Sequence, residues 1–154
     1  MAVEIERKFL VERVPGHALG WPGERIEQGY AALADEVEVR LRRYGGRCLL
    51  TVKRGSGLER DEWEIELSEA QLETLWPATA GRRVVKTRRV GEVDGVGVEL
   101  DVFEVALDGL VVAEVEVGSE EAARAFRPPA WFGREVTDDA RYANRSLAVN
   151  GRPD

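Results

Sequence analysis

The sequence predicts a mainly β protein, folded as a closed eight-stranded antiparallel β-barrel with a charged interior and about three flanking helices. Three observations lead to this prediction: eight strand-like segments, short turns between most of them, and charges that repeat two residues apart. Short connections favour antiparallel neighbours. Eight strands with few helices between them are typical of a barrel.

The strand-like segments alternate apolar and polar residues or carry β-branched runs. They cover residues 3–11, 25–32, 36–44, 47–54, 59–67, 82–90, 96–104 and 111–117. Gly45-Gly46 predicts a tight hairpin between the third and fourth segments, and Gly55-Ser56-Gly57 joins the fourth to the fifth. Asp94-Gly95 and Asp108-Gly109 mark the turns before the last two segments.

Three helices are predicted, at residues 68–76, 119–127 and 137–147. Each begins at a Ser or Thr, and acidic residues or a Gln follow in the first turn. Ser68 and Gln71 have the spacing of a capping box. We expect the apolar faces of these helices to cover the apolar outer faces of the strands.

Same-sign charges two residues apart are the most informative pattern, because side chains two apart on a strand share a face. The first segment has Glu4, Glu6 and Lys8 on one face, and Ile5 and Phe9 on the other. Similar pairs recur later, as Glu36/Glu38, Arg40/Arg42, Glu62/Glu64/Glu66, Lys86/Arg88, Glu99/Asp101 and Glu114/Glu116. A single pair of this kind is usually a solvated face with cross-strand ion pairs. Such pairs on six segments, with apolar residues on the opposite faces, favour a charged interior.

Composition excludes several classes of protein. The 154 residues fit one domain over 1–149, with a frayed tail at 150–154. The net charge of −7 argues against nonspecific binding to nucleic acid or to an anionic membrane. Cys48 is the only cysteine, so no internal disulfide is possible, and we expect a buried thiol. Neither a signal peptide nor a run of about 20 apolar residues is present, so a cytoplasmic protein is expected.

The charged faces predict a site for a triphosphate and its metal. If the first and eighth strands are neighbours, the two pairs of glutamates come together and could hold one or two Mg²⁺ or Mn²⁺ ions. Basic side chains are suited to phosphate oxygens. The candidates are Lys8, Arg40, Arg42, Lys53, Lys86 and Arg88. Acids, metal ions and bases in one cavity are what phosphoryl transfer requires.

The charged elements also resemble a known family, the CYTH superfamily or triphosphate tunnel metalloenzymes. Glu4-Ile5-Glu6-Arg7-Lys8 matches the Glu-x-Glu-x-Lys signature that opens its members. The later elements follow in order: Arg40-Leu41-Arg42, Thr51-Val52-Lys53, Glu62-Trp63-Glu64, Lys86-Thr87-Arg88, Glu99-Leu100-Asp101 and Glu114-Val115-Glu116. Gln28-Gly29-Tyr30, Leu75-Trp76-Pro77-Ala78-Thr79 and Trp131-Phe132-Gly133 are similar to the short stand-alone bacterial members, inorganic tripolyphosphatases.

This resemblance implies an eight-stranded tunnel, a divalent metal and triphosphate hydrolysis. It implies metal ligation by Glu4, Glu6, Glu114 and Glu116, and catalysis by these four together with Lys8 and Lys86. Substrate binding falls to Lys8, Arg40, Arg42, Lys53, Lys86 and Arg88, and the acidic lining to Glu62, Glu64, Glu99 and Asp101.

The sequence therefore predicts a metal-dependent enzyme that hydrolyses a phosphoanhydride bond of inorganic tripolyphosphate or of a compact organic triphosphate. Two alternatives stay open: a class IV adenylate cyclase that makes cyclic AMP from ATP, and a polyphosphate-binding module without catalysis. The expected partner is a small polyphosphate, with no nucleic acid and no membrane. Apolar residues on the outer strand faces would permit a homodimer. The shared motifs leave the substrate open among tripolyphosphate, ATP and thiamine triphosphate.

Overall fold

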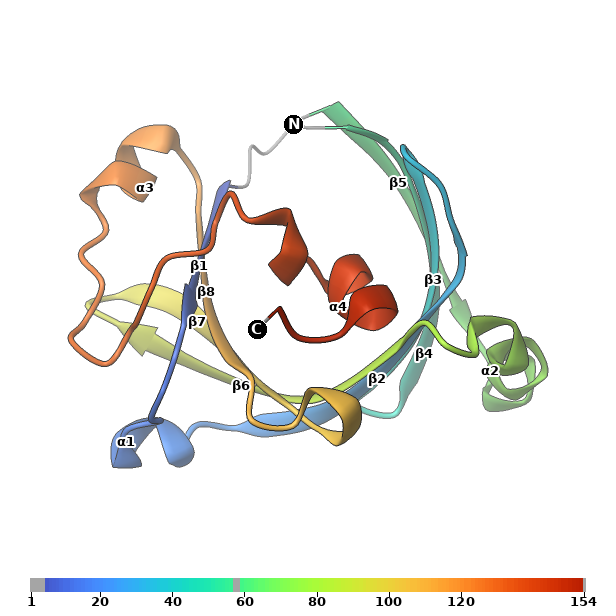
Figure 1. The fold of residues 1–154 in the computed structure, drawn as a ribbon, viewed down its shortest axis with the longest axis horizontal. Helices are drawn as coiled ribbons and strands as arrows, with labels where there is room; N and C mark the ends of the chain where they lie inside the picture. The colour runs from blue at the N-terminus through green and yellow to red at the C-terminus, as the bar shows by residue number, and fades with distance from the viewer. Residues whose placement is uncertain (1–4, 57–58, 154) are drawn as a thin grey trace.

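One curved antiparallel sheet forms the body of the protein. The computed structural model describes residues 5–56 and 59–153. The strands are β1 (Ile5–Leu10), β2 (Gly23–Leu33), β3 (Val37–Tyr44), β4 (Arg47–Ser56), β5 (Glu59–Leu67), β6 (Arg83–Val93), β7 (Val96–Phe103) and β8 (Val111–Val117). They form an eight-stranded sheet in the order β1-β8-β7-β6-β2-β3-β4-β5. The sheet curls around a central space (Figure 1).

The predicted closed barrel is wrong, because the sheet of the described residues has two edges, β1 and β5, that do not pair with each other. The free edge of β1 is instead used by residues 133–136. Leu10 N donates to Arg134 O (2.9 Å) and Val136 N donates to Lys8 O (2.8 Å). Phe9 forms an isolated bridge with Glu135. Since these groups of β1 already have partners, β5 cannot complete a ladder with them.

The hairpin predicted at Gly45-Gly46 is confirmed. Gly45 and Gly46 have φ values of 57° and 81°, in the left-handed region that favours glycine. The turn brings Tyr44 opposite Arg47 and sets the register of β3 and β4. As a result Glu38 faces Lys53 across the pair.

Three short helices lie on the outer side of the sheet: α1 (Gly16–Leu19), α2 (Glu69–Leu75) and α3 (Glu120–Ala125). The predicted capping box of α2 is confirmed, since Ser68 Oγ accepts from Gln71 N (3.1 Å) and Gln71 Oε1 accepts from Ser68 N (2.8 Å). Leu72 of α2 packs against Leu41 and the buried Cys48. No helix in the described part of the chain is long and apolar enough to cross a membrane.

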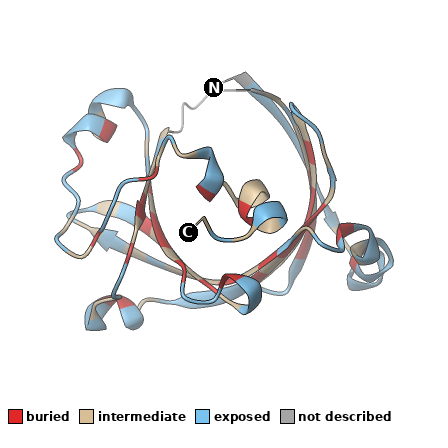
Figure 2. Cartoon of the chain, viewed as in Figure 1, coloured by how far each residue is buried: buried red, intermediate tan, exposed pale blue. Residues whose placement is uncertain are grey.

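A fourth helix, α4 (Asn144–Asn150), lies on the concave side of the sheet, which the prediction of a helix at 137–147 did not foresee (Figure 1). Asp139 instead caps a short 3₁₀ turn, Ala140–Tyr142, and α4 begins only at Asn144. Leu147 and Tyr142 pack against strand residues such as Val84. The concave side is therefore apolar around Leu147, and Figure 2 shows buried positions on α4 and on the strands around it.

Part of the outer face of β5 has no helix over it. Trp63 is 49% exposed and Ile65 is 59% exposed. The expectation that helices cover these two residues is wrong, because α2 packs over β3 and β4 through Leu72. A homodimer through this face stays a prediction.

Candidate active site

A cavity of about 320 Å³ opens on the concave side of the sheet, beside α4. Every strand except β7 contributes a side chain to its wall, together with the first residues of α4. The wall consists of Glu6, Lys8, Tyr30, Glu38, Arg40, Arg42, Lys53, Arg60, Arg88, Glu114, Ala143, Asn144 and Arg145. Seven of these carry a positive charge and three a negative charge, so the cavity favours an anion.

Strand register brings the basic side chains of the wall together. Arg40 and Arg42 are two apart on β3 and therefore share a face. Arg40 lies opposite Tyr30 on β2. Lys53 lies on β4, where burial lowers its pKa and the nearby Arg40 lowers it further. The wall thus concentrates like charges that repel one another in the absence of an anion.

Arg40 shows most directly that the cavity is built for a ligand. The residue is only 9% exposed. Its Nε is buried and has no hydrogen-bond partner, the one such side-chain atom among the described residues. Buried polar groups are almost always satisfied, so this donor points to an acceptor that a bound molecule would supply.

Arg42 is anchored by an uncharged partner. Gln28 Oε1 accepts hydrogen bonds from Arg42 Nε (3.0 Å) and Nη2 (2.7 Å). The amide nitrogen of Gln28 donates to the hydroxyl of Tyr30 (3.2 Å). Burial lowers the pKa of Arg42 to about 10, with Arg40 and Arg88 lowering it further. Burial also raises the pKa of Tyr30, so its hydroxyl stays protonated near neutral pH.

A buried network of carboxylates and bases lies behind the wall. Asp101 accepts two hydrogen bonds from Arg88 (2.8 and 2.9 Å) and forms an ion pair with Lys86 Nζ (2.8 Å). Burial would raise the pKa of Asp101, but Lys86 and Arg88 outweigh it and lower the value. Lys86 is completely buried, and burial lowers its pKa to about 8. Lys86 also donates to Asn144 Oδ1 (3.1 Å), which links the network to α4.

Two predicted metal ligands line the cavity, Glu6 and Glu114. Burial and the neighbouring Glu6 raise the pKa of Glu114 to about 7. Glu116 lies opposite Glu6 in the β1–β8 ladder, but it is exposed and is not part of the wall. Glu4 lies outside the described residues. Within residues 5–56 and 59–153, no three His, Cys, Asp or Glu side chains gather as metal ligands.

The predicted acidic lining does not reach the wall. Glu99 forms an ion pair with Arg88 (2.7 Å), and Asp101 lies behind the same arginine. Glu64 accepts a hydrogen bond from Thr51 (2.7 Å), and Glu62 lies opposite Lys53. These carboxylates therefore contact the basic residues or their strand neighbours.

Sequence reasoning did not assign Arg60, Asn144 and Arg145 to the site. Arg60 shares a strand face with Glu62 and Glu64, so the two-residue period could have found it. Arg145 donates to Ala34 O (2.7 Å), and Arg60 lies 3.4 Å from Glu38. No local signal places Asn144 and Arg145 in the cavity, because their position depends on α4 lying on the concave side.

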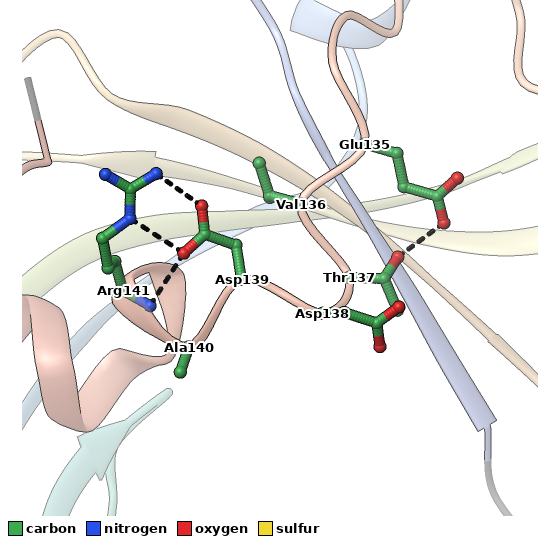
Figure 3. A pocket seen from close by; sticks show the side chains of 7 residues that line it. All are labelled: Glu135, Val136, Thr137, Asp138, Asp139, Ala140 and Arg141. Carbon is green, nitrogen blue, oxygen red and sulfur yellow. Dashed lines mark hydrogen bonds and ion pairs between the residues drawn. The ribbon is translucent and has the colours of Figure 1, made fainter.

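A second hollow has fewer features of a binding site. It is lined by one continuous segment, Glu135–Arg141 (Figure 3). Thr137 donates to Glu135 (2.6 Å), and Arg141 pairs with Asp139 (2.7 Å). Glu135 also pairs with Arg7 of β1 (2.8 Å). Because Glu135, Asp139 and Arg141 already have protein partners, this hollow has less need of a ligand than the cavity beside α4.

Comparisons with known proteins agree with this geometry. The CYTH domain model matches residues 2–147. An inorganic triphosphatase of Nitrosomonas europaea is 50% identical over 149 residues, which cover 96% of this chain and 97% of that protein. One from Acetivibrio thermocellus is 36% identical, over 97% of this chain and 96% of that protein. A crystal structure of an inorganic triphosphatase superposes with a TM-score of 0.81 and 47% identity, covering 97% of this chain and 96% of that one.

Proposed function

The chain belongs to the CYTH domain family, and from this premise we propose that it hydrolyses inorganic tripolyphosphate with the help of a divalent metal. The observation that carries the proposal is the buried, unpartnered Nε of Arg40 in a cavity wall with seven bases and three acids. Relatives that align over almost the whole chain are named inorganic triphosphatases.

The bases of the wall supply the binding and the charge neutralisation. Lys8, Arg40, Arg42, Lys53 and Arg88 would hold the phosphate oxygens, and Arg60 and Arg145 extend this set. Charge that spreads onto the oxygens during phosphoryl transfer is stabilised by such fixed cations. Lys86, held by Asp101 and Asn144, would keep Arg88 and the start of α4 in place.

The acids fit a divalent metal. Burial and Glu6 raise the pKa of Glu114 to about 7. The ionised form of this carboxyl group is therefore disfavoured in the metal-free protein, and a bound cation would stabilise it. Magnesium prefers a few carboxylates, several waters and substrate phosphates. Glu6 and Glu114, joined by Glu4 and Glu116, would hold one or two Mg²⁺ or Mn²⁺ ions. When bound, such ions neutralise phosphate charge and acidify a water for in-line attack.

The wall also favours a substrate made only of phosphate. Apart from Tyr30 and Ala143, every lining residue is charged or an amide. Only Tyr30 and Ala143 therefore offer apolar surface to a nucleobase or to a thiazole ring. A nucleoside would have to stay outside, whereas tripolyphosphate places all its oxygens within reach of cations.

A substrate panel tests the proposal. We expect catalytic efficiency to fall in the order tripolyphosphate, ATP, pyrophosphate, because pyrophosphate leaves several bases unpaired. Released phosphate is measured at matched free Mg²⁺ and again with Mn²⁺. Cyclic AMP and pyrophosphate formed from ATP would instead indicate a cyclase, and tight binding without phosphate release would indicate a binding module.

A further inference from the structure

Gln28 is completely buried and lies against Arg42, a residue of the cavity wall. It lies directly opposite Arg42 in the β2–β3 ladder. Its carbonyl oxygen accepts two hydrogen bonds from Arg42, and its amide nitrogen donates to Tyr30. A guanidinium only donates, so these contacts fix which end of the amide faces Arg42.

The partner of Arg42 differs from that of the other buried arginine of the wall. Arg88 is held by carboxylates, with two hydrogen bonds to Asp101 and a 2.7 Å ion pair with Glu99. Arg42 makes no ion pair with a carboxylate of the described residues, and both of its side-chain hydrogen bonds go to the neutral Gln28. Carboxylates in direct contact therefore compensate the charge of Arg88, whereas Arg42 has only the more distant attraction of Asp101.

The bonds to Gln28 also leave part of Arg42 available. They use the Nε–Nη2 edge of the guanidinium. Nη1 and the second hydrogen of Nη2 remain as donors for an oxyanion. Arg42 belongs to the cavity wall, so these donors are where a phosphate would bind.

We propose that Gln28 is a positioning residue, which holds Arg42 rigidly for a phosphate group without neutralising its charge. The inference rests on the proposed function. A glutamate at this position would hold Arg42 equally well but would compete with the phosphate for its charge. An apolar residue would leave the charge intact but would release the side chain, which then loses entropy on binding. A neutral amide avoids both penalties.

The isosteric substitution Gln28→Glu separates this role from a structural one. We expect KM for tripolyphosphate to rise roughly tenfold or more, the range for loss of a hydrogen bond to a charged group. The kcat at saturating substrate should stay within a factor of about three, because the chemistry at the metal is untouched. The metal-free variant should melt no lower than the wild type, because the new carboxylate pairs with Arg42 in a cluster rich in cations.

Gln71→Glu is the matched control. Gln71 lies in the capping box of α2 on the outer side of the sheet. Glutamate is also favoured at this position of a capping box, and the net charge changes by the same amount. KM should remain that of the wild type.

A second variant, Gln28→Met, keeps the volume and the neutrality but removes the amide. We expect its KM to lie between those of the wild type and Gln28→Glu. If Gln28→Glu does not fold, a KM of Gln28→Met above that of the wild type is the expected result, and a wild-type KM would contradict the role of Gln28. Wild-type KM in the folded Gln28 variants, or a lower kcat with unchanged KM and a lower melting temperature, would overturn the role of Gln28. Failure of the wild type to bind or hydrolyse tripolyphosphate would instead overturn the proposed function.

Discussion

Arg40 and Arg42 are neighbours on one face of β3, yet the protein supports them differently. Arg42 is anchored by Gln28, whereas the Nε of Arg40 is buried without a partner among the described residues. An unsatisfied buried donor costs about 1–3 kcal/mol. A phosphate oxygen that accepts from this donor would recover that free energy on binding, which places part of the binding energy in a single residue.

The acids and the bases of the cavity should fail differently when they are mutated. We expect Arg40→Ala to lower kcat/KM for tripolyphosphate roughly a hundredfold at every metal concentration, as removal of one fixed electrostatic group does. Glu6→Gln should raise the metal concentration needed for half-maximal activity, with partial recovery at high metal. Initial rates over a grid of metal and substrate concentrations measure both. Arg54→Ala is the control, because Arg54 is exposed and lies over Trp63 on the outer face. If Arg40→Ala and Glu6→Gln both lost activity independently of the metal concentration, the assignment of bases to substrate and acids to metal would be wrong.

Glu114 should link the stability of the metal-free protein to pH. Burial and Glu6 raise its pKa from 4.5 to about 7. The folded state then binds this proton more tightly than the unfolded state. Protonation of Glu114 therefore stabilises the folded state fully below pH 4.5, and this stabilisation is lost as the pH rises through about 7. The free energy of unfolding should fall by roughly 3 kcal/mol as this stabilisation is lost.

Urea unfolding in a chelator across this pH range measures the effect. Glu114→Gln should remove most of the fall between pH 4.5 and 7. Glu66→Gln, exposed on β5, should keep it. A wild-type slope in Glu114→Gln would show that another group causes the fall.

At the scale of elements, features encoded by nearby residues were predictable from sequence. The strands follow from alternation, the β3–β4 hairpin from Gly45-Gly46, and the start of α2 from Ser68 and Gln71. The same alternation predicted that Arg40, Arg42 and other charges share one face. These signals act over two to four residues, so the sequence contains them directly.

Features that depend on distant contacts were not predictable. Thr137 was expected to begin a helix, but its hydroxyl accepts from Lys8 N (3.1 Å), a residue 129 positions away, and donates to Glu135. This segment occupies the edge of β1, which leaves the sheet open and moves the helix start to Asn144. Asn144 and Arg145 enter the cavity wall for the same reason.

The helix on the concave side should therefore matter for binding as well as for stability. Leu147 anchors α4 and is 2% exposed. We expect Leu147→Ala to lower the free energy of unfolding by about 2–5 kcal/mol, as large-to-small core substitutions do. It should also raise KM, because Asn144 and Arg145 lose their fixed position in the wall.

Leu72→Ala is the matched control, because Leu72 is equally buried but anchors α2 on the outer side. It should cost similar stability and leave KM unchanged. Chemical denaturation and steady-state kinetics below both melting temperatures measure the two effects. Equal KM in the two variants would show that α4 does not shape the binding site.

At the scale of the whole molecule, charge is distributed unevenly. The chain carries a net charge of −7, but its cavity wall has seven bases and only three acids. A cleft with one sign of charge concentrates the field and attracts ions of the opposite sign. The acidic exterior disfavours large polyanions such as nucleic acid. The protein therefore attracts a small phosphate compound into the cavity and repels large polyanions from the rest of its surface.

This uneven charge predicts that the protein gains stability from its ligand more than from the metal alone. Repulsion among the bases of the wall is relieved only when a polyanion binds, and a ligand at one hundred times its Kd adds about 2.7 kcal/mol to the free energy of unfolding. For a chain of this size the melting temperature should rise by roughly 5–10 °C.

Thermal scans with Mg²⁺ and a non-hydrolysable imido analogue of tripolyphosphate measure the shift. Mg²⁺ alone and pyrophosphate should give smaller shifts, and Arg40→Ala should lose much of the gain. An unchanged melting curve at millimolar analogue would mean that the cavity does not bind a triphosphate.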